Sequence, residues 1–495
     1  MRHLVAIAAA FAVASVTGCD LAPHYMQPEY AVPDTYQGAG PWQIAHPLDH
    51  IQRGFWWTDF GNATLNDLET QVPKNPDILA EREAYLQARE LAAEAESALY
   101  PQIGLNNQLS QNRQSPQRLT RSFTSTSPLV EPSAQIDAQA SWEIDFWQQI
   151  TNQARARKRL AQAEAANLAS LELSLQAELA NSYIALRGLD QQAQLLRQTV
   201  VTYETALSIT RSRLAGKIGS ALDVDRAQTQ LSTSRGQLEE TLAQRALALH
   251  AIADLIGVSA TGFTLPPQQD SPLKVPHIPT GLPSELLQRR PDIAAAERDM
   301  AAANAEIGVA RAAFYPNVSL YGLSGIETAG IDVFNLPERM WSIGSAIDLP
   351  VFEGGLRRAE LGFADSAYRQ TRDSYRAIVL GAFRDVEDQL SLNDYLAKES
   401  IQDAQAARSS AQAQQLSMQM YVAGATNYLE VVVAQIAAFQ AANSGLSIDI
   451  RVQQAAINLI RALGGGWSAE LLPPEEAILP FDPLKPPFGV RSGGP

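Results

Sequence analysis

The sequence predicts an α+β membrane protein built from two tandem repeats, each combining a pair of strands with long helices. Three observations predict this fold class. Similar landmarks recur at nearly constant offsets, short segments alternate apolar and polar side chains, and long proline-free stretches carry a heptad rhythm. The chain also opens with an export signal, so we take its elements in order from the N-terminus.

Residues 1–18 have the organisation of a signal peptide. Arg2 precedes an apolar run from Leu4 to Val16, and small residues then lead to Cys19. The run is shorter than the roughly 20 apolar residues that a spanning helix needs. We therefore predict export, and no transmembrane α-helix.

The segment Val16-Thr17-Gly18-Cys19 resembles a bacterial lipobox, in which the cysteine thiol is diacylglycerated and the new amino terminus is acylated after cleavage. We predict covalent lipid such as palmitate on Cys19, at the head of a lipidated segment over residues 19–60. Cys19 is the only cysteine, so no internal disulfide can form. The alternative is a signal peptide that happens to end beside a cysteine. Three acyl chains would exceed the two signals that stable anchoring needs.

Two pairs of landmarks identify the repeats. Leu99-Tyr100-Pro101 is echoed by Phe314-Tyr315-Pro316, and Leu222-Asp223-Val224 is echoed by Leu429-Glu430-Val431. Because the landmarks recur in the same order, they indicate tandem duplication.

Pro-rich stretches bound the two copies, since such a composition cannot continue a helix. We place the first repeat at 61–265, a linker at 266–283, the second repeat at 284–465 and a C-terminal tail at 466–495. Each repeat is expected to run helix, strand pair, long helix, turn, long helix.

Each predicted strand pair has one apolar and one polar face. The apolar positions are Ile103, Leu105, Leu109, Ile136, Ala138, Ala140, Trp142 and Ile144 in the first pair, and Val318, Leu320, Trp341, Ile343, Ile347 and Leu349 in the second. This period-two pattern fits a half-buried sheet, or a barrel wall with lipid outside and water inside. The Ser/Thr-rich loop from Arg113 to Pro132 is expected on an exposed rim.

The helices give the stronger signal. No proline occurs from about Gln148 to Arg213, and apolar residues there step by four and three, as in a coiled coil. These residues are Leu189, Ala193, Leu196, Val200, Tyr203 and Leu207, and the rhythm returns at Val379, Phe383, Val386 and Leu390. Such a helix spans roughly 100 Å. A stack of shorter helices is less favoured, because the first break signal is Gly216.

Several motifs resemble the outer-membrane factor (TolC-like) family, the lipoprotein exit channels of tripartite (RND-type) efflux systems and of type I secretion systems. The motifs are Leu286-Leu287-Gln288-Arg289-Arg290-Pro291-Asp292-Ile293, Asp348-Leu349-Pro350-Val351-Phe352-Glu353-Gly354-Gly355, Tyr183-Ile184-Ala185-Leu186-Arg187 and Phe55-Trp56-Trp57. The resemblance covers nearly the whole mature chain.

The resemblance implies a homotrimer in the cell outer membrane. Four strands from each protomer would build one shared β-barrel, continuous with a long periplasmic α-helical barrel. Four strands alone cannot hide their edges in lipid, whereas closure across subunits satisfies every backbone group. The implied partners are a periplasmic adaptor (membrane fusion) protein, an inner-membrane pump and outer-membrane lipid.

The resemblance also implies that the helical tips contact the adaptor and close the tunnel. The implied adaptor-contacting residues are Gly216, Lys217, Gly219 and Ser220 in the first tip, and Gly424, Ala425 and Thr426 in the second. The glycines are expected to permit the reversal of each helix.

Three residues of this chain lie at positions that resemble those of the family's periplasmic gate. Leu429 resembles the apolar constriction ring and Glu430 the acidic ring, with Asp223 of the first tip as an eligible partner. The chain departs from the family at Val433, where a second acidic residue is expected, and the second tip has no arginine. The alternative for both carboxylates is a solvated position at a helix start, which the helix dipole favours.

A further departure is Asp20, directly after Cys19. In enteric bacteria an aspartate at this place tends to hold a lipoprotein in the inner membrane. A barrel built from strands would have no function in that membrane. We keep the outer-membrane prediction. It requires either that the source organism sorts lipoproteins by different rules or that the barrel overrides the aspartate signal.

The composition argues against other classes of protein. The net charge is −15 with no long basic run, which disfavours nucleic acid as a partner. His46 and His50 have helical metal spacing, but Pro47 makes a helix there unfavourable, so we predict no metal site. No nucleophile elbow, P-loop or dinucleotide fingerprint occurs, and we predict neither an enzyme nor any cofactor beyond the lipid.

Two alternatives to an efflux duct stay open. A type I secretion duct would have the same architecture. A periplasmic coiled-coil scaffold or adaptor lipoprotein would share the lipobox and heptads, but it has no need for Trp142 and Trp341 in alternating strands, where tryptophans suit a membrane-interface belt.

Overall fold

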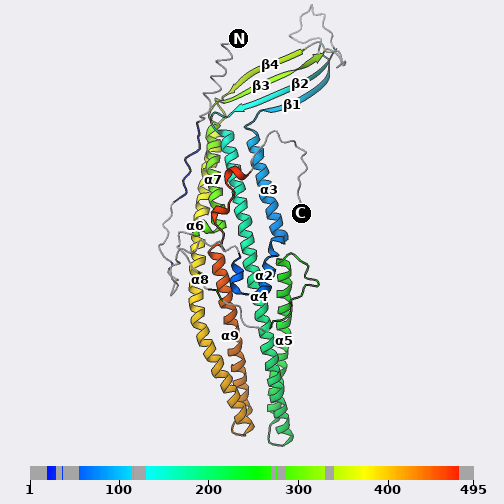
Figure 1. Ribbon diagram of the computed structural model, residues 1–495, viewed down its shortest axis with the longest axis vertical. Coiled ribbons are helices and arrows are strands. Elements are labelled where there is room, and N and C mark those ends of the chain that lie inside the picture. The colour runs from blue at the N-terminus through cyan, green and yellow to red at the C-terminus, as the bar shows by residue number, and fades with distance from the viewer. Residues whose placement is uncertain are drawn as a thin grey trace, which may run out of the picture.

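The computed structural model describes residues 19–28, 36, 55–113, 115, 130–268, 275–276, 278, 286–328 and 339–478. The predicted signal peptide and most of the predicted linker, rim loop and C-terminal tail lie outside these residues. The described part is elongated, with a sheet at one end and helices running away from it to two hairpin tips (Figure 1).

The chain folds as two copies of one unit. The first consists of α3 (Pro76–Ser97), β1 (Gln102–Arg113), β2 (Val130–Ile144), α4 (Gln149–Ala215) and α5 (Ala221–Leu255). The second consists of α7 (Pro291–Ala312), β3 (Asn317–Thr328), β4 (Arg339–Asp348), α8 (Leu356–Val422) and α9 (Tyr428–Ala462). Corresponding helices have equal lengths, 22, 67 and 35 residues in each copy. The predicted duplication is confirmed.

Short elements surround these units. They are η3 (Trp56–Phe60), α2 (Ala63–Glu69), η4 (Val72–Lys74), α6 (Leu286–Arg289), η6 (Ala469–Leu471) and α10 (Glu475–Ile478). The aromatic residues of η3 pack with α2 against the middle of α4, in the largest apolar cluster of the described chain.

The four strands form one antiparallel sheet in the order β1-β2-β3-β4. Its register aligns the predicted apolar positions on one face: Ile103 lies opposite Ala140, which aligns through Gly322 with Ile343. The polar neighbours alternate onto the other face. The predicted rim loop, Arg113 to Pro132, is wrong at both ends. Arg113 belongs to β1 and pairs with Val130, and Pro132 belongs to β2 and pairs with Gln111 of β1.

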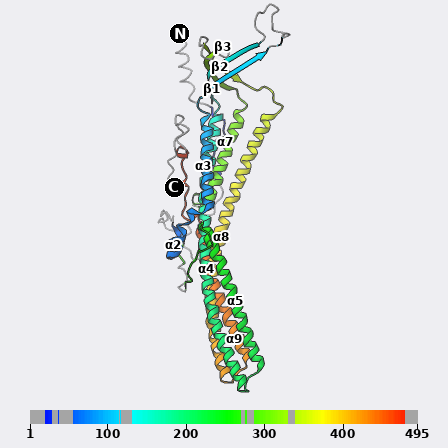
Figure 2. The same cartoon turned by 90° about the vertical axis from the view of Figure 1, so that its right-hand side faces the viewer.

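The long helices form the axis of the molecule. α4 and α8 each span roughly 100 Å, and the predicted heptad residues Leu196, Tyr203 and Leu390 are buried between helices. The shorter helices lie along them: α3 and α5 follow α4, α9 follows α8, and α7 lies between α4 and α8 (Figures 1 and 2).

In each copy, the start of one helix meets the end of another. In the first copy α3 begins beside the end of α5, in the second α7 begins beside the end of α9, and one residue bridges each joint. Asn75 caps the start of α3 and donates from Nδ2 to the Leu255 carbonyl at the end of α5, at 3.0 Å. At the same place in the second copy, Arg290 donates to both oxygens of Asp292 in α7 and to the Ala462 carbonyl of α9, at 3.3 Å. The repeat therefore preserves the joint while changing its chemistry from a neutral amide to a cation.

Among the helices that the structure describes, only α9 is long and apolar enough to cross a membrane by length and composition, with a mean hydropathy of 1.4 over its best window. It packs along α8 and contacts α4 and α5, and several of its side chains, such as Val431, Ile457 and Leu459, are buried in the helical core. Part of its apolar surface is thus used in helix packing.

Glu69, in α2, is a buried acid. Its side chain is 1% exposed, and neither carboxylate oxygen has a hydrogen-bond partner among the described residues. Burial disfavours the charged form and raises the pKa of Glu69 to about 9. This residue is therefore neutral at pH 7 in the folded chain.

Stability should consequently fall with pH above the unfolded-state pKa of Glu69. The unfolded chain releases this proton near pH 4.5, whereas the folded chain keeps it until about pH 9. At pH 7 the difference costs about 3 kcal/mol. We expect Glu69→Gln to be more stable than wild type at pH 7, with the gap in thermal unfolding closing toward pH 5. Parallel pH profiles would contradict this account, and Glu83→Gln, on the exposed surface of α3, is the matched control.

Candidate functional site

The first hairpin tip joins α4 to α5 through residues 216–220. Gly216 keeps a negative φ of −76°, and the left-handed residue is Lys217, at φ 57°. Gly219 instead allows the tip backbone to pass close to the end of α4, because a Cβ there would lie 3.0 Å from the Leu214 nitrogen. Ser220 then caps α5 by accepting from the Leu222 amide at 3.1 Å. The expected glycine at the reversal is therefore wrong for this tip.

The second tip joins α8 to α9 and reverses at a glycine, as expected. Gly424 has φ 78°, and the Ala425 amide donates to the Met420 carbonyl at 2.8 Å. Asn427 caps α9 by accepting from the amide of Glu430 at 3.2 Å. The carboxylate of Glu430 thus stands in the first turn of α9, where the helix dipole favours a negative charge.

The predicted gate residues occupy different settings. Leu429 is 45% exposed, and Val433, one turn further along α9, is 56% exposed. These two side chains form an apolar surface that their own protomer covers only in part. Asp223 lies 3.9 Å from Arg226 on its own helix, and no ion pair joins it to the second tip among the described residues.

A residue of the first tip that had no assigned role connects the two hairpins. Nη1 of Arg213 donates to the carbonyls of Tyr421 and Val422, at 3.2 and 3.3 Å. The guanidinium also lies 4.7 Å from the centroid of the Tyr421 ring. Arg213 thus holds the end of α8 through hydrogen bonds and a cation–π contact.

Three tyrosines extend this contact across the bundle. The rings of Tyr421 and Tyr428 are in tilted contact with centroids 5.2 Å apart, and Tyr203 of α4 lies in the same buried cluster. Burial, followed by the neighbouring Tyr421 and Tyr203 rings and the Asp223 charge, raises the pKa of Tyr428 to about 12. All three hydroxyls are neutral at physiological pH, so the tip core stays uncharged apart from Arg213 and Asp223.

Only one signal could have identified the Arg213 contact. Arg213 and Tyr421 occupy nearly equivalent places in the two copies, since their separation almost equals the offset between the two tips.

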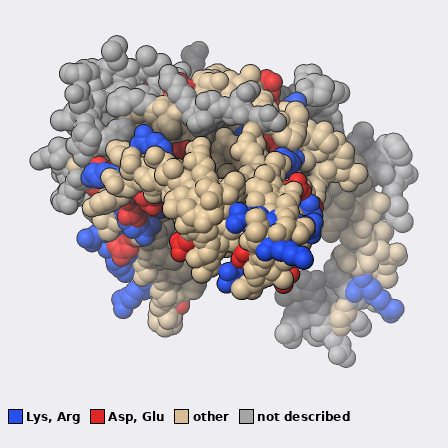
Figure 3. Space-filling view, turned by 90° about the horizontal axis from the view of Figure 1, so that it is seen from below, with Lys and Arg blue, Asp and Glu red and all other residues tan. Residues whose placement is uncertain are grey.

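Seen from below, the molecule shows mostly uncharged surface with scattered basic and acidic groups (Figure 3).

The opposite end of the helical part carries the predicted lipidation site. Cys19 is exposed, and its backbone amide donates to the Phe146 carbonyl at 3.1 Å. Phe146 lies between β2 and α4, where the sheet meets the helices. The backbone of Cys19 is therefore held where the sheet meets the helices.

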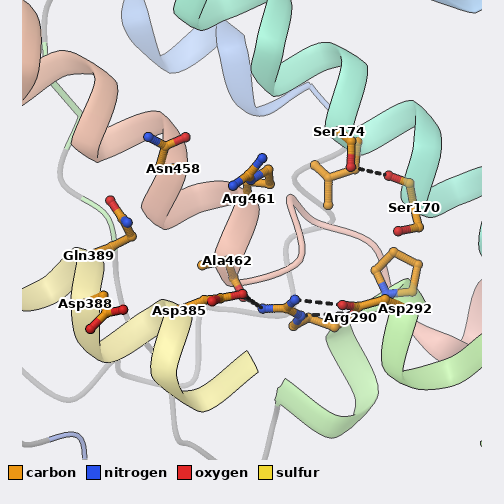
Figure 4. A pocket seen from close by; sticks show the side chains of 12 residues that line it. Ser170, Ser174, Arg290, Asp292, Asp385, Asp388, Gln389, Asn458, Arg461 and Ala462 are labelled. Atoms are coloured by element: carbon orange, nitrogen blue, oxygen red, sulfur yellow. Dashed lines mark hydrogen bonds and ion pairs between the residues drawn. The ribbon is translucent and has the colours of Figure 1, made fainter. Parts of the chain in front are cut away.

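A cavity of about 250 Å³ lies at the joint of the second copy (Figure 4). Arg290 lines it from below, with Asp292 of α7 and Asp385 of α8, and Asn458 and Arg461 of α9 complete the wall. Each of the two nearest carboxylates interacts with Arg290. The arrangement pairs a mostly buried cation with two carboxylates at a helix joint.

Metal binding has no candidate in this part of the chain. Over the described ranges, no group of three or more His, Cys, Asp and Glu side chains could hold a metal ion.

Comparisons with known proteins agree with this architecture. The family model "Outer membrane efflux protein" matches residues 72–258 and 282–465, one match to each copy. The chain is 31% identical to outer membrane protein OprJ of Pseudomonas aeruginosa, over 91% of this chain and 93% of that protein. It is 29% identical to the cation efflux system protein CusC of Escherichia coli, over 92% and 97%.

The fold has close counterparts among solved structures. The outer-membrane channel OprN superposes with a TM-score of 0.82 at 26% identity, over 91% of this chain and all of that one. The family and fold expected from the motifs are thus confirmed, as is the expectation of a transport protein with no enzymatic activity. The chain belongs to the outer membrane efflux protein (TolC-like) family and is an outer-membrane efflux channel with a periplasmic helical part.

Proposed function

We propose that this channel is the lipid-anchored, homotrimeric exit duct of a tripartite efflux assembly. An inner-membrane pump and a periplasmic adaptor would deliver substrate into its helical end. The observation that carries the trimer is the sheet itself: β1 and β4 are both edge strands, each 10 or more residues long. Unpaired edges of this length cannot face lipid, so β4 of one protomer would pair with β1 of the next.

The tips are the proposed adaptor contact and gate. Their outermost residues, from Gly216 to Ser220 and from Gly424 to Thr426, protrude beyond the helical core and are open to a partner. Leu429 and Val433 lie on a face of α9 that the described residues cover only in part. In a trimer, this face would meet its copies at the axis and form an apolar constriction, with Glu430 beside it.

Efflux is favoured over type I secretion because the name of CusC assigns it to a cation efflux system. The name of OprJ specifies no substrate, and this chain is about equally similar to both. The substrate is therefore proposed to be selected by the pump and adaptor rather than by the duct.

The gate is tested by conductance in planar bilayers. Leu429→Ala should widen or wet the apolar ring and raise single-channel conductance, because hydrophobic constrictions close by dewetting. Glu430→Gln should mainly lower the preference for cations, since it removes the ring of like charges. Leu247→Ala, an exposed apolar residue on α5 away from the tips, is the matched control. Wild-type conductance and selectivity in both gate variants would refute the assignment.

A further inference from the structure

The residue after the predicted lipidation site is bound by the fold. Oδ1 of Asp20 accepts from the side-chain amide of Asn152 and from the backbone amide of Ala22, each at 3.0 Å. Oδ2 accepts from Nη1 of Arg155 at 3.0 Å, which is also an ion pair. Both carboxylate oxygens are therefore occupied, although the side chain is 38% exposed.

The donors are themselves fixed by the helical part. Asn152 is fully buried on α4, and its own oxygen accepts from Arg155 at 2.6 Å. These two residues and Asp20 form a closed set that we call the Asp20 clamp. Partial burial opposes ionisation of Asp20, but the hydrogen bonds from Asn152 and Ala22 and the charge of Arg155 lower its pKa below the ordinary value. The carboxylate is thus held charged and paired.

The segment that follows is bound along α7. Arg311 donates to the Leu21 carbonyl at 3.3 Å, and buried Asn304 donates to the Pro23 carbonyl at 2.8 Å. Gly308 makes this approach possible, because a Cβ there would come within 2.7 Å of the Ala22 side chain and of the Asn152 amide. Segment 19–23 is therefore a built part of the fold rather than a free tether.

We propose that this fold masks Asp20 as an inner-membrane retention signal. An aspartate beside a lipidated cysteine can retain a lipoprotein only if its carboxylate is open to recognition. In the folded chain, a competing lipid ammonium or protein cation must compete with Arg155 and Asn152 for the carboxylate. The lipoprotein-sorting machinery would thus meet an N-terminus whose signal is already occupied, which allows passage to the outer membrane. This inference rests on the proposed lipid anchor.

The test is localisation in an enteric host in which a reporter lipoprotein with aspartate after its cysteine is retained. Wild type, Asn152→Leu/Arg155→Ala and the same double variant with Asp20→Ser are labelled with palmitate, and their inner and outer membranes are separated. We expect wild type in the outer membrane, a shift of most of the labelled double variant to the inner membrane, and return of the triple variant to the outer membrane. Arg157→Ala, two residues along α4 and exposed, should behave as wild type.

Gly308→Val breaks the clamp by steric displacement and leaves its charges in place, so it should also be retained and be rescued by Asp20→Ser. An outer-membrane location of both clamp variants would overturn the proposal. Retention that Asp20→Ser does not relieve would also overturn it, because the cause would then be misfolding. Absence of label on wild type would instead refute the proposed lipid anchor, and this inference with it.

Discussion

Replacing Arg213 by alanine is expected to open the channel. The variant loses two hydrogen bonds from a charged donor and a cation–π contact, all of which join α4 to the end of α8. A loss of about 2 kcal/mol per protomer is reasonable for such contacts. If the two hairpins separate when the tunnel opens, the open state gains about 30-fold for each protomer. Single-channel recordings should show longer openings and higher mean conductance.

The controls separate this contact from a general charge effect. Lys217→Ala removes a positive charge from the same tip, and Lys217 makes no ion pair or hydrogen bond to another described side chain. It should leave opening unchanged. Arg213→Lys should be intermediate, because one ammonium cannot reproduce the planar fork. If Arg213→Ala conducts like wild type while Lys217→Ala opens the channel, Arg213 does not hold the hairpins together.

A charge on the apolar face of the sheet should have the second large effect. Ile343 shares its row with Ile103 and Ala140, and its side chain is largely exposed in the protomer. An arginine facing lipid costs about 2 to 4 kcal/mol near the midplane, and a trimer would carry three. We expect Ile343→Arg to abolish most outer-membrane trimer. Ser342→Arg, one residue away on the polar face, should assemble and alter only conductance. Equal tolerance at both positions would contradict the assignment of the two faces.

Local patterns in the sequence were sufficient to predict the elements of the fold. Alternation placed Ile103 and Ile343 on one face, because side chains in a strand alternate with period two whatever surrounds them. The heptad at Leu196 and Tyr203 likewise fixes which side of a long helix is buried. These inferences require no knowledge of contacts between distant residues.

Contacts between distant residues account for what was missed. Arg213 and Tyr421 are 208 residues apart, and only the packing of the two hairpins brings them together. The first tip is a local exception: the left-handed conformation falls at Lys217, a residue type that gives no signal for it, and Gly219 packs closely against Leu214. Asp20 looked like a conflict with the outer membrane because Asn152 and Arg155, its partners, lie far along the chain.

The mass of the protein extracted in mild detergent tests the central proposal, a shared barrel, most directly. β1 and β4 each present an unpaired edge, and the protomer covers Leu429 and Val433 only in part. Light scattering with correction for bound detergent should therefore give three times the chain mass, with strand content retained. A stable monomer with full strand content would contradict the account, since four strands would then survive with both edges open.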